Sequence, residues 1–267
     1  ADPDKLALGE ALFGDPQLFA TGHLACVTCH DVNSNGASPN RFEVVSGVPL
    51  RVNTPTVFNA ALNFRLDWTG DQSTLEQQVT SALRVHGSIA NDPDEVAARL
   101  NEAPNIKNRF QQVYGHAADR ANLLDAIATY ERSLVTPGSR FDRWLEGDQS
   151  ALSANEVEGY GYFKSMGCIA CHQGENVGGN VFEHSGVFHP LTDSGSIRLR
   201  VPPLRNVATT APYFHDGSAP TLADAVRRMA SAQLNRKLTD PQTQAIVAFL
   251  NTLTGDYNGT PVRTAPP

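Results

Sequence analysis

The sequence contains the pattern C-x-x-C-H twice, as CVTCH at residues 26–30 and as CIACH at residues 168–172. Two thiols at this spacing add to the two vinyl groups of a haem, and the histidine that follows binds the iron as its proximal ligand. The two runs use all four cysteines of the chain: Cys26, Cys29, Cys168 and Cys171. We therefore predict two covalently bound haem c groups, with His30 and His172 as proximal ligands.

Paired cysteines also occur in zinc sites and in thioredoxin-like redox proteins. A zinc site needs four converging ligands, whereas here each cysteine pair is followed at once by its own histidine, and the two copies lie far apart in the sequence. A thioredoxin-like pair does not need that histidine, and still less does it need it twice. Both alternatives explain fewer of these residues than haem attachment does.

Composition restricts the partners of the chain. The formal net charge of −7 over 267 residues becomes more negative once haem propionates are added, which argues against a nucleic-acid partner. The same charge is compatible with docking a basic or neutral redox protein. No stretch of the sequence approaches 18 apolar residues, so we expect no membrane span.

The cell compartment follows from the haem chemistry. Attachment of haem to C-x-x-C-H in bacteria takes place outside the cytoplasmic membrane. The chain begins Ala1-Asp2-Pro3, which looks like a mature end left after cleavage of a signal peptide. We therefore expect a periplasmic protein.

The elements that position the two motifs are predicted to be mainly helices with long loops and little β structure. Helix starts are indicated by Asp2-Pro3, Asp92-Pro93, the capping box Ser153–Glu156, Thr221 and Asp240-Pro241. Apolar residues every four positions at 75, 79 and 83, and an apolar pattern over 123–134, predict two more helices. Short strands are expected at 42–45 and 197–201, and the Pro-rich tail from residue 260 is expected to fray.

One haem motif in each half predicts two cytochrome c-like haem domains. The run Pro137-Gly138 is the candidate boundary between them. The predicted domains are 1–137, which contains the first motif, and 138–267, which contains the second.

The residues resemble the bacterial dihaem cytochrome c peroxidases and their relatives of the MauG type. The resemblance covers most of the chain and rests on order and spacing. It includes the two haem motifs, Leu8-Gly9, Leu12-Phe13, Asn53-Thr54-Pro55-Thr56, Trp68, Phe141-Asp142-Arg143, Leu152-Ser153-Ala154, Pro203–Val207 and Ala211–Gly217.

The resemblance implies a role for each haem. The haem on His30 corresponds to the peroxidatic haem, and the haem on His172 corresponds to the electron-transfer haem. In the peroxidases a methionine after the Tyr-Phe-His-Asp-Gly run is the sixth ligand of the second haem, and Met229 stands at that position. A thioether favours Fe(II) and raises the potential. Met166, the other methionine, is interpreted as a packing residue. Without the resemblance, Met229 would also be interpreted as a packing residue.

The resemblance also implies a bridge and a calcium ion. Trp68 matches the tryptophan that lies between the two haems in this family. The alternative interpretation of Trp68 is core packing. The family holds Ca²⁺ with oxygen ligands, and Asn53, Thr210 and Pro212 match those positions, the last two through backbone carbonyls. Family members are often dimers, so a homodimer is expected from the resemblance alone.

The chain departs from the peroxidase pattern in the loop after the first motif. Many of these peroxidases carry a histidine there that blocks the oxidised peroxidatic iron, whereas this chain has Val45-Ser46 at the aligned position and no His or Met from 31 to 53. We therefore predict an open iron that needs no reductive activation, a MauG-like trait. His23 could instead bind the first haem iron, but we favour its interpretation as a surface loop histidine.

The residues expected on the distal side of the first haem also differ from the peroxidase pattern. The family places Gln, Pro and Glu after the tryptophan, and the Glu moves the proton during O–O cleavage. Gln78 matches the first, but Ala82 and Ser88 fall near the other two. Arg84 and His86 are candidates for that proton transfer, with a solvated helix end as the alternative interpretation and Glu76 as a weaker candidate.

Two functions follow from these observations. One is a peroxidase that reduces hydrogen peroxide to water with electrons from a small cytochrome c or cupredoxin. The other is a MauG-like oxidase that uses peroxide to oxidise Trp or Tyr residues of a partner protein. Met229 favours the first, and the missing loop histidine favours the second. A plain electron-transfer cytochrome is disfavoured because it has no use for an open iron.

Overall fold

The computed structural model describes residues 2–45, 47–85 and 91–266. Its contacts divide the chain into two compact units, of which the first comprises Ala1–His30 and Gln72–Leu134, and the second comprises Asp31–Asp71 and Val135–Pro267. Each unit therefore contains one C-x-x-C-H motif. The domain division at residue 137 stays a prediction, and the compact units differ from it because residues 31–71 pack with the second motif rather than with the first.

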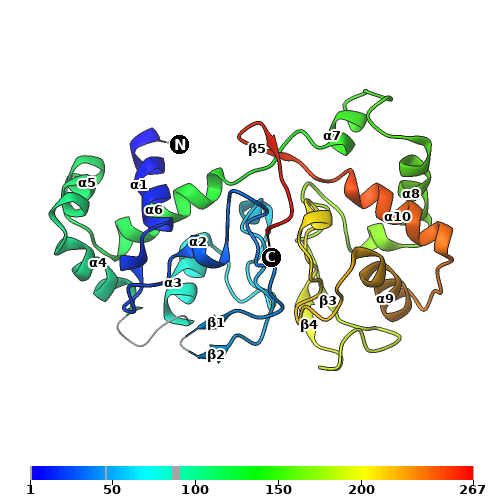
Figure 1. Ribbon diagram of the computed structural model, residues 1–267, viewed down its shortest axis with the longest axis horizontal. Coiled ribbons are helices and arrows are strands. Elements are labelled where there is room, and N and C mark those ends of the chain that lie inside the picture. The colour runs from blue at the N-terminus through cyan, green and yellow to red at the C-terminus, as the bar shows by residue number, and fades with distance from the viewer. Residues whose placement is uncertain (1, 46, 86–90, 267) are drawn as a thin grey trace. The chain divides into compact units, whose positions relative to one another are not determined.

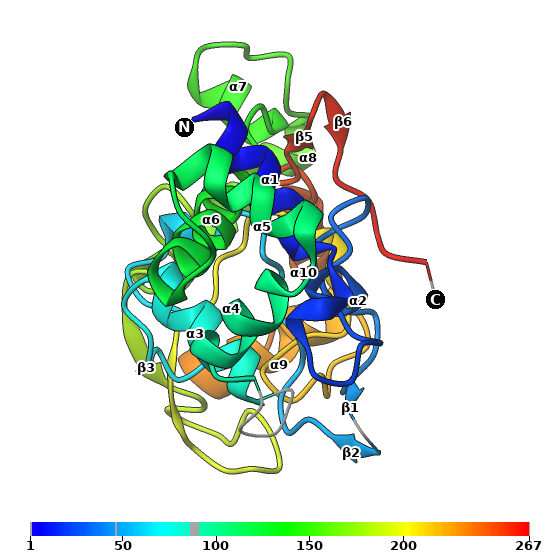
Figure 2. The same ribbon diagram turned by 90° about the vertical axis from the view of Figure 1, so that its left-hand side faces the viewer.

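The first unit is helical. Its elements are α1 (Pro3–Phe13), η1 (Pro16–Leu18), α2 (Cys26–Cys29), α3 (Leu75–Val85), α4 (Pro93–Asn101), α5 (Pro104–Tyr114) and α6 (Arg120–Ser133). Helix α6 packs against both α1 and α3, as Figures 1 and 2 show from two sides. Leu75, Val79 and Leu83 are buried on α3, as their spacing predicts.

The second unit combines helices with short two-stranded ribbons. Its elements are β1 (Val44–Val45), β2 (Val48–Pro49), η2 (Ala60–Leu62), α7 (Arg140–Leu145), α8 (Ala154–Ser165), η4 (Cys168–Ala170), β3 (Phe182–His184), β4 (Arg198–Arg200), η5 (Val207–Thr209), α9 (Leu222–Leu234), α10 (Asp240–Asn251), β5 (Asp256–Tyr257) and β6 (Thr260–Pro261). The strands pair antiparallel as β1–β2, β3–β4 and β5–β6. The fold is mainly α, as predicted.

Glycines let the main helix pairs approach closely. In the first unit a Cβ on Gly9 of α1 would lie 2.1 Å from the carbonyl oxygen of Ala126 on α6. In the second unit a Cβ on Gly159 of α8 would lie 1.8 Å from the carbonyl oxygen of Ala245 on α10. Each haem motif is therefore accompanied in its own unit by a helix pair that is in contact at a glycine.

Side-chain caps begin the helices where the sequence places them. Asp2 accepts from the Asp4 N–H at 2.9 Å at the start of α1. Asp92 accepts from the Asp94 N–H at 3.2 Å at the start of α4. Ser153 and Glu156 form the predicted capping box of α8. These bonds satisfy backbone donors that have no partner within the helix.

Three features differ from the sequence-based expectations. Helices α5 and α7 are not predicted, although α7 has a Ser139–Asp142 capping box. The expectation that the tail frays is wrong: Thr260–Pro261 pairs with Asp256–Tyr257, and the Val262 N–H donates to the Gly255 carbonyl at 3.0 Å. Burial of Val262 offsets the entropy of ordering this segment.

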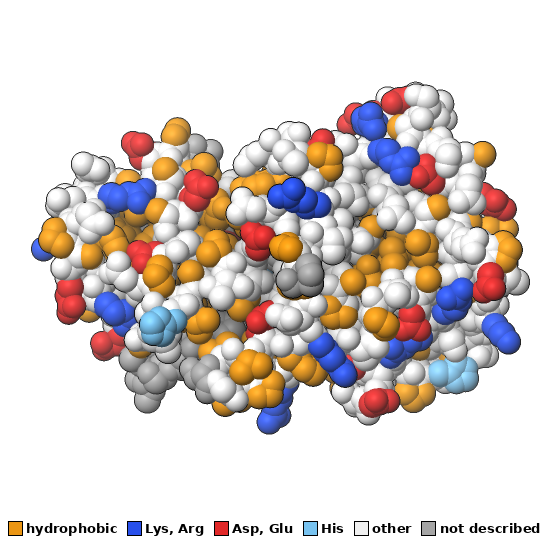
Figure 3. Space-filling model, in the orientation of Figure 1, with side chains coloured by type: hydrophobic (Ala, Val, Ile, Leu, Met, Phe, Trp, Pro, Cys, Tyr) orange, Lys and Arg blue, Asp and Glu red, His pale blue; other side chains and the backbone are white. Residues whose placement is uncertain are grey.

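Two surface observations complete the fold. Hydrophobic side chains gather over the β1–β2 ribbon (Figure 3), where Val44 and Val48 are exposed. A two-residue ribbon cannot bury both faces, so these side chains remain in contact with water. Among the described residues, no helix has the length and apolar character required to cross a membrane.

Candidate haem sites

The first motif forms a single helical turn. Cys26 and Cys29 are the ends of α2, and the His30 N–H donates to the Cys26 carbonyl at 2.9 Å. Thr28, one of the two variable residues of the motif, accepts from the Ala25 N–H at 3.0 Å through its hydroxyl and so fixes the start of the turn. Neither Cys26 nor Cys29 forms a disulfide. This turn places the residues in the order that haem attachment requires.

The second motif repeats this geometry. Gly167, with φ of 102°, ends the preceding helix α8 and turns the chain into η4. The His172 N–H donates to the Cys168 carbonyl at 3.0 Å, the equivalent of the His30–Cys26 bond. Cys168 and Cys171 likewise form no disulfide. The two motifs are thus equivalent locally, although one turn is α-helical and the other is 3₁₀.

The ionisation of these groups fits haem better than a thiolate metal. Burial, together with the Glu131 carboxyl, raises the pKa of Cys26 to about 12, and burial also raises the pKa values of Cys168 and Cys171. Thiolates are the form that binds zinc, whereas a thioether bond carries no charge and suits a buried site. In the described part of the chain no three His, Cys, Asp or Glu side chains converge as metal ligands.

His172 has the properties of an iron ligand. It is 9% exposed, and burial lowers its pKa to about 4, against the backbones of Pro202 and Val177, which favour the protonated ring. The imidazole is therefore neutral near pH 7. Its Nδ1 is buried without a hydrogen bond of acceptable geometry to the described residues. A buried, neutral ring with backbone carbonyls beside it fits the proximal position of a haem.

The residues assigned by resemblance to the second haem lie in the same unit as His172. Met229 is half-buried on α9. Met166 packs against the hydrophobic core of this unit, as predicted. The role of Met229 as a ligand stays a prediction.

Trp68 is connected to a network of backbone bonds. Its Nε1–H donates to the Asn53 carbonyl at 2.9 Å, and the Asn53 N–H donates to the His215 carbonyl at 2.7 Å. The Trp68 and His215 rings meet edge to face, with centroids 6.2 Å apart. His215 is buried, its Nδ1 has no hydrogen-bond partner among the described residues, and burial lowers its pKa against the opposing effect of Asp216. The indole is therefore held in one orientation beside a neutral imidazole.

Of the predicted calcium residues, Asn53 belongs to this network, and Thr210 and Pro212 precede His215 in the sequence. Asn53 is buried, and its Nδ2 donates to the carbonyls of Asn40 at 3.0 Å and Arg41 at 3.4 Å. Thr210 follows η5, and Pro212 follows a cis Ala211–Pro212 bond. The segments around residues 53 and 215 are joined by the backbone bond described above. Carbonyl and amide oxygens are the ligands that Ca²⁺ prefers, and the calcium site stays a prediction.

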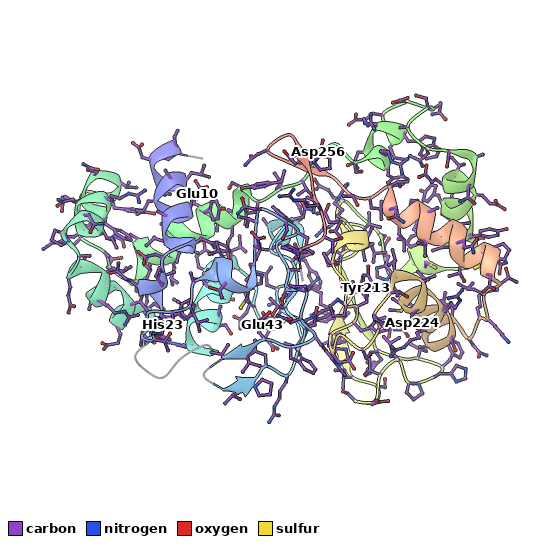
Figure 4. All side chains as sticks on the ribbon, viewed as in Figure 1. Glu10, His23, Glu43, Tyr213, Asp224 and Asp256 are labelled. Carbon is purple, nitrogen blue, oxygen red and sulfur yellow. The ribbon has the colours of Figure 1, made fainter. Side chains whose placement is uncertain are left out.

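The predicted distal residues lie on α3 of the first unit. The Oε1 of Gln78 is buried without a hydrogen-bond partner among the described residues. Arg84 is exposed and pairs with Asp92, with Nη2–Oδ2 at 2.6 Å. Glu76 pairs with Arg132 of α6. His86 and Ser88 lie outside the described residues, and His23 is exposed on the segment that leads into α2 (Figure 4).

Sequence reasoning missed Glu131, a buried carboxyl group in the first unit. Its Oε2 has no hydrogen-bond partner among the described residues, and burial raises its pKa to about 8, with Arg132 opposing and Glu76 reinforcing the shift. Its charge also acts on Cys26. The signal was available, because Glu131 stands four residues after Ile127 on the apolar face of α6.

Comparison with known proteins identifies the family. The model of the di-haem cytochrome c peroxidase family matches residues 3–150, more than half of the chain. The chain belongs to this family. A second model, of RoxA-like cytochrome c-like proteins, matches residues 200–230.

Relatives within the family include peroxidases and MauG proteins. The chain is 38% identical to cytochrome c peroxidase Ccp of Escherichia coli, covering 96% of this chain but only 59% of that protein. It is 36% identical to cytochrome c551 peroxidase of Nitrosomonas europaea, covering 99% of this chain and 84% of that protein. It is 29% identical to methylamine utilization protein MauG of Methylorubrum extorquens, covering 94% of this chain and 78% of that protein.

The fold agrees with solved structures. A MauG-like protein associated with microbial copper homeostasis superposes with a TM-score of 0.83 at 24% identity, covering 96% of this chain and 91% of that one. The dihaem peroxidase BthA of Burkholderia thailandensis superposes with a TM-score of 0.80 at 19% identity, covering 96% and 87%. The description of the family names two haems, and the chain has two C-x-x-C-H motifs, whose role as the attachment sites stays a prediction.

Proposed function

We propose that this chain is a periplasmic dihaem peroxidase that reduces hydrogen peroxide to water with electrons from a small cytochrome c or a cupredoxin. The observation that carries the choice is Met229, half-buried on α9 in the unit of the second haem motif. A thioether ligand raises the potential of a haem and suits it to accept electrons. The identity of 38% to cytochrome c peroxidase Ccp of Escherichia coli, against 29% to MauG of Methylorubrum extorquens, supports the same choice.

When bound, the two haem c groups supply the iron centres that receive electrons and reduce peroxide. The protein fixes them through Cys26, Cys29, Cys168 and Cys171 and keeps the proximal rings of His30 and His172 in place. In the first unit the Gln78 Oε1, which has no hydrogen-bond partner among the described residues, would accept a hydrogen bond from peroxide or water. Arg84 and His86 remain the proposed proton-transfer groups, although the Arg84 side chain is engaged with Asp92 at the surface.

Trp68 is proposed to carry electrons between the haems. An aromatic ring offers an intermediate site for an electron or a hole. The Nε1–H donates to the Asn53 carbonyl, a weak base, so an oxidised indole would have no good proton acceptor at that position. Asn53, Thr210 and Pro212 are proposed to hold one Ca²⁺ and so to fix the segment to which Trp68 is bonded. A homodimer is proposed from the family alone.

The second candidate function is a MauG-like oxidation of Trp or Tyr residues in a partner protein. It is favoured by the absence of His and Met from residues 31–53, because an iron without an internal distal ligand reacts with peroxide directly. The two functions differ in their electron source. The peroxidase takes electrons from a small redox protein, whereas the oxidase takes them from the side chains of its substrate.

The deciding experiment combines spectroscopy with turnover. EPR of the oxidised protein, before any reductant, is expected to show a high-spin and a low-spin ferric haem. Steady-state oxidation of reduced small cytochrome c or cupredoxin by peroxide is then expected without a pre-reduction lag. Two low-spin signals would contradict the open iron. An open iron that reacts with peroxide but oxidises neither donor would favour the MauG-like function.

Met229→Leu tests the ligand that carries the proposal. A leucine cannot ligate iron, so the low-spin signal of the second haem should be replaced or strongly altered, and electron entry from the donor should be lost. Met166→Leu is the matched control, because Met166 packs in the core and should leave both signals unchanged. An unaltered low-spin signal in Met229→Leu would show that another residue is the sixth ligand.

A further inference from the structure

A buried arginine in the second unit directs its side-chain hydrogen bonds to backbone carbonyls. Arg200, at the end of β4, is 4% exposed, and burial lowers its pKa to about 10 while Asp67 opposes that shift. Its Nε donates to the Asp67 carbonyl at 3.1 Å and its Nη1 to the Val201 carbonyl at 3.4 Å. It forms no ion pair within the described part of the chain. Its hydrogen bonds therefore go to neutral acceptors, and the Asp67 carboxylate acts on it from beyond ion-pair distance. A buried charge in this setting is costly and favours a closer anion.

The strand pattern shows that this burial is specific. Residues 198 and 200 project to the same face of β4, because side chains alternate along a strand. Arg198 is exposed, with its guanidinium 4.0 Å from the ring centroid of Phe182, whereas Arg200 on the same face is enclosed. The Arg200 N–H also donates to the Trp68 carbonyl at 2.9 Å. Only one of two neighbouring arginines is therefore withdrawn from water.

Arg200 is tied to the second haem motif through its neighbours in sequence. The Pro202 backbone lies beside the His172 ring. The Gly179 N–H donates to the Val201 carbonyl at 2.9 Å, and a Cβ on Gly178 would lie 2.3 Å from the Pro202 carbonyl oxygen. The loop that follows the motif thus approaches residues 201–202 more closely than a side chain would allow. This contact places the backbone that directly follows Arg200 beside the proximal histidine.

We propose that Arg200 binds a propionate carboxylate of the second haem, through its guanidinium N–H groups, and thereby sets the potential of that haem. The propionates are the anions that haem attachment adds to this unit. A guanidinium presents N–H donors in a fork that matches a carboxylate, and such bonds strengthen in a buried site. The proposal depends on haem attachment to the second motif and not on which substrate the enzyme oxidises.

The test is the reduction potential of the second haem in Arg200→Gln, measured by spectroelectrochemical titration of the holoprotein. Removal of the buried positive charge leaves the propionate uncompensated and stabilises ferric iron. The equilibrium should shift about tenfold toward the oxidised haem, equivalent to a potential ~59 mV lower for a one-electron couple. Arg198→Gln is the matched control, and its shift should stay below about twofold because that charge is exposed to water.

A second variant covers the case in which Arg200→Gln does not load haem. Arg200→Lys keeps the charge but replaces the fork with a single ammonium group. Resonance Raman spectra should then show a shifted propionate-bending band, with the potential close to that of the wild type. The proposal is overturned if Arg200→Gln shifts the redox equilibrium of the second haem less than twofold, or if the potential of the first haem shifts instead. It is also overturned if the propionate band of Arg200→Lys coincides with that of the wild type.

Discussion

Glu131 is a single residue whose environment has a measurable consequence for stability. Its carboxyl is buried on α6 with an orphaned Oε2, and burial raises its pKa from 4.5 to about 8. The folded protein therefore binds this proton more tightly than the unfolded chain does between these pH values. Linkage then requires the free energy of unfolding to fall as pH rises through that window.

We predict that Glu131→Gln removes this decline. A shift of about 3.5 units, from 4.5 to about 8, at 1.36 kcal/mol per unit sets an upper bound of ~5 kcal/mol on the effect. In urea unfolding of the holoprotein at pH 5, 7 and 9, the free energy of unfolding of the wild type should fall relative to that of the variant as pH rises. The control is Glu10→Gln, an exposed residue of α1 in the same unit (Figure 4). Parallel curves for wild type and Glu131→Gln would contradict the buried, protonated state.

At the scale of elements, the glycine contacts of the two helix pairs are the positions most sensitive to a small change. A methyl group on Gly9 or Gly159 would meet a backbone carbonyl oxygen at 2.1 or 1.8 Å, and neither contact is relieved by rotating a side chain. The helices would have to separate. Since each pair belongs to a haem unit, the separation would also disturb the unit that contains the motif.

We predict that Gly9→Ala and Gly159→Ala each destabilise the protein by about 1–3 kcal/mol, as overpacking does in other cores. Gly161→Ala is the matched control on α8, because a Cβ there meets no atom within 4 Å. Alanine has the higher helix propensity, so this variant should be stabilised by roughly 0.5–1 kcal/mol. Thermal unfolding of the holoproteins measures all three. A neutral Gly159→Ala would show that α8 and α10 do not approach as described.

At the scale of the whole molecule, the proposed calcium ion would act on folding as a ligand of the native state. Its proposed residues come from segments distant in sequence, around 53 and 210–212, so the site exists only when the second unit is folded. A ligand that binds only the native state stabilises it by mass action. Oxygen donors of this kind select Ca²⁺ over the smaller Mg²⁺, which demands stricter geometry.

We predict that Ca²⁺ at about 100 times its Kd stabilises the protein by ~2.7 kcal/mol relative to the chelated protein. For a chain of this size, each kcal/mol corresponds to roughly 2–4 °C in Tm. Calorimetry with EGTA, with added Ca²⁺ and with added Mg²⁺ distinguishes the ions. A Tm that does not respond to EGTA or to Ca²⁺ would remove the proposed site.

Much of the secondary structure was predictable because its signals are local. Caps at Asp2, Asp92 and Ser153 and the spacing of Leu75, Val79 and Leu83 require only neighbouring residues to be interpreted. Helix α5 was not predicted because Ile106 and Phe110 are its only buried residues, and two residues are too few to make a pattern. The ordered tail escaped because its stability comes from pairing with β5 rather than from its own composition.

The sequence by itself determined the chemistry of attachment. Two thiols and a histidine at fixed spacing define a haem c site whatever surrounds them, because the covalent geometry lies within five residues. It also identified the family through the order of its motifs. These conclusions depend on residue types and on short separations along the chain.

Only the tertiary structure decided which side chains are withdrawn from water and what they meet there. Arg198 and Arg200 look alike in sequence, yet one is solvated and the other is enclosed beside the second motif. The Oε2 of Glu131 and the Oε1 of Gln78 are buried without hydrogen-bond partners in the described part of the chain. Likewise, residues 31–71 follow the first motif in the chain but pack with the second. Burial and pairing depend on contacts between segments far apart in sequence, and local patterns do not contain that information.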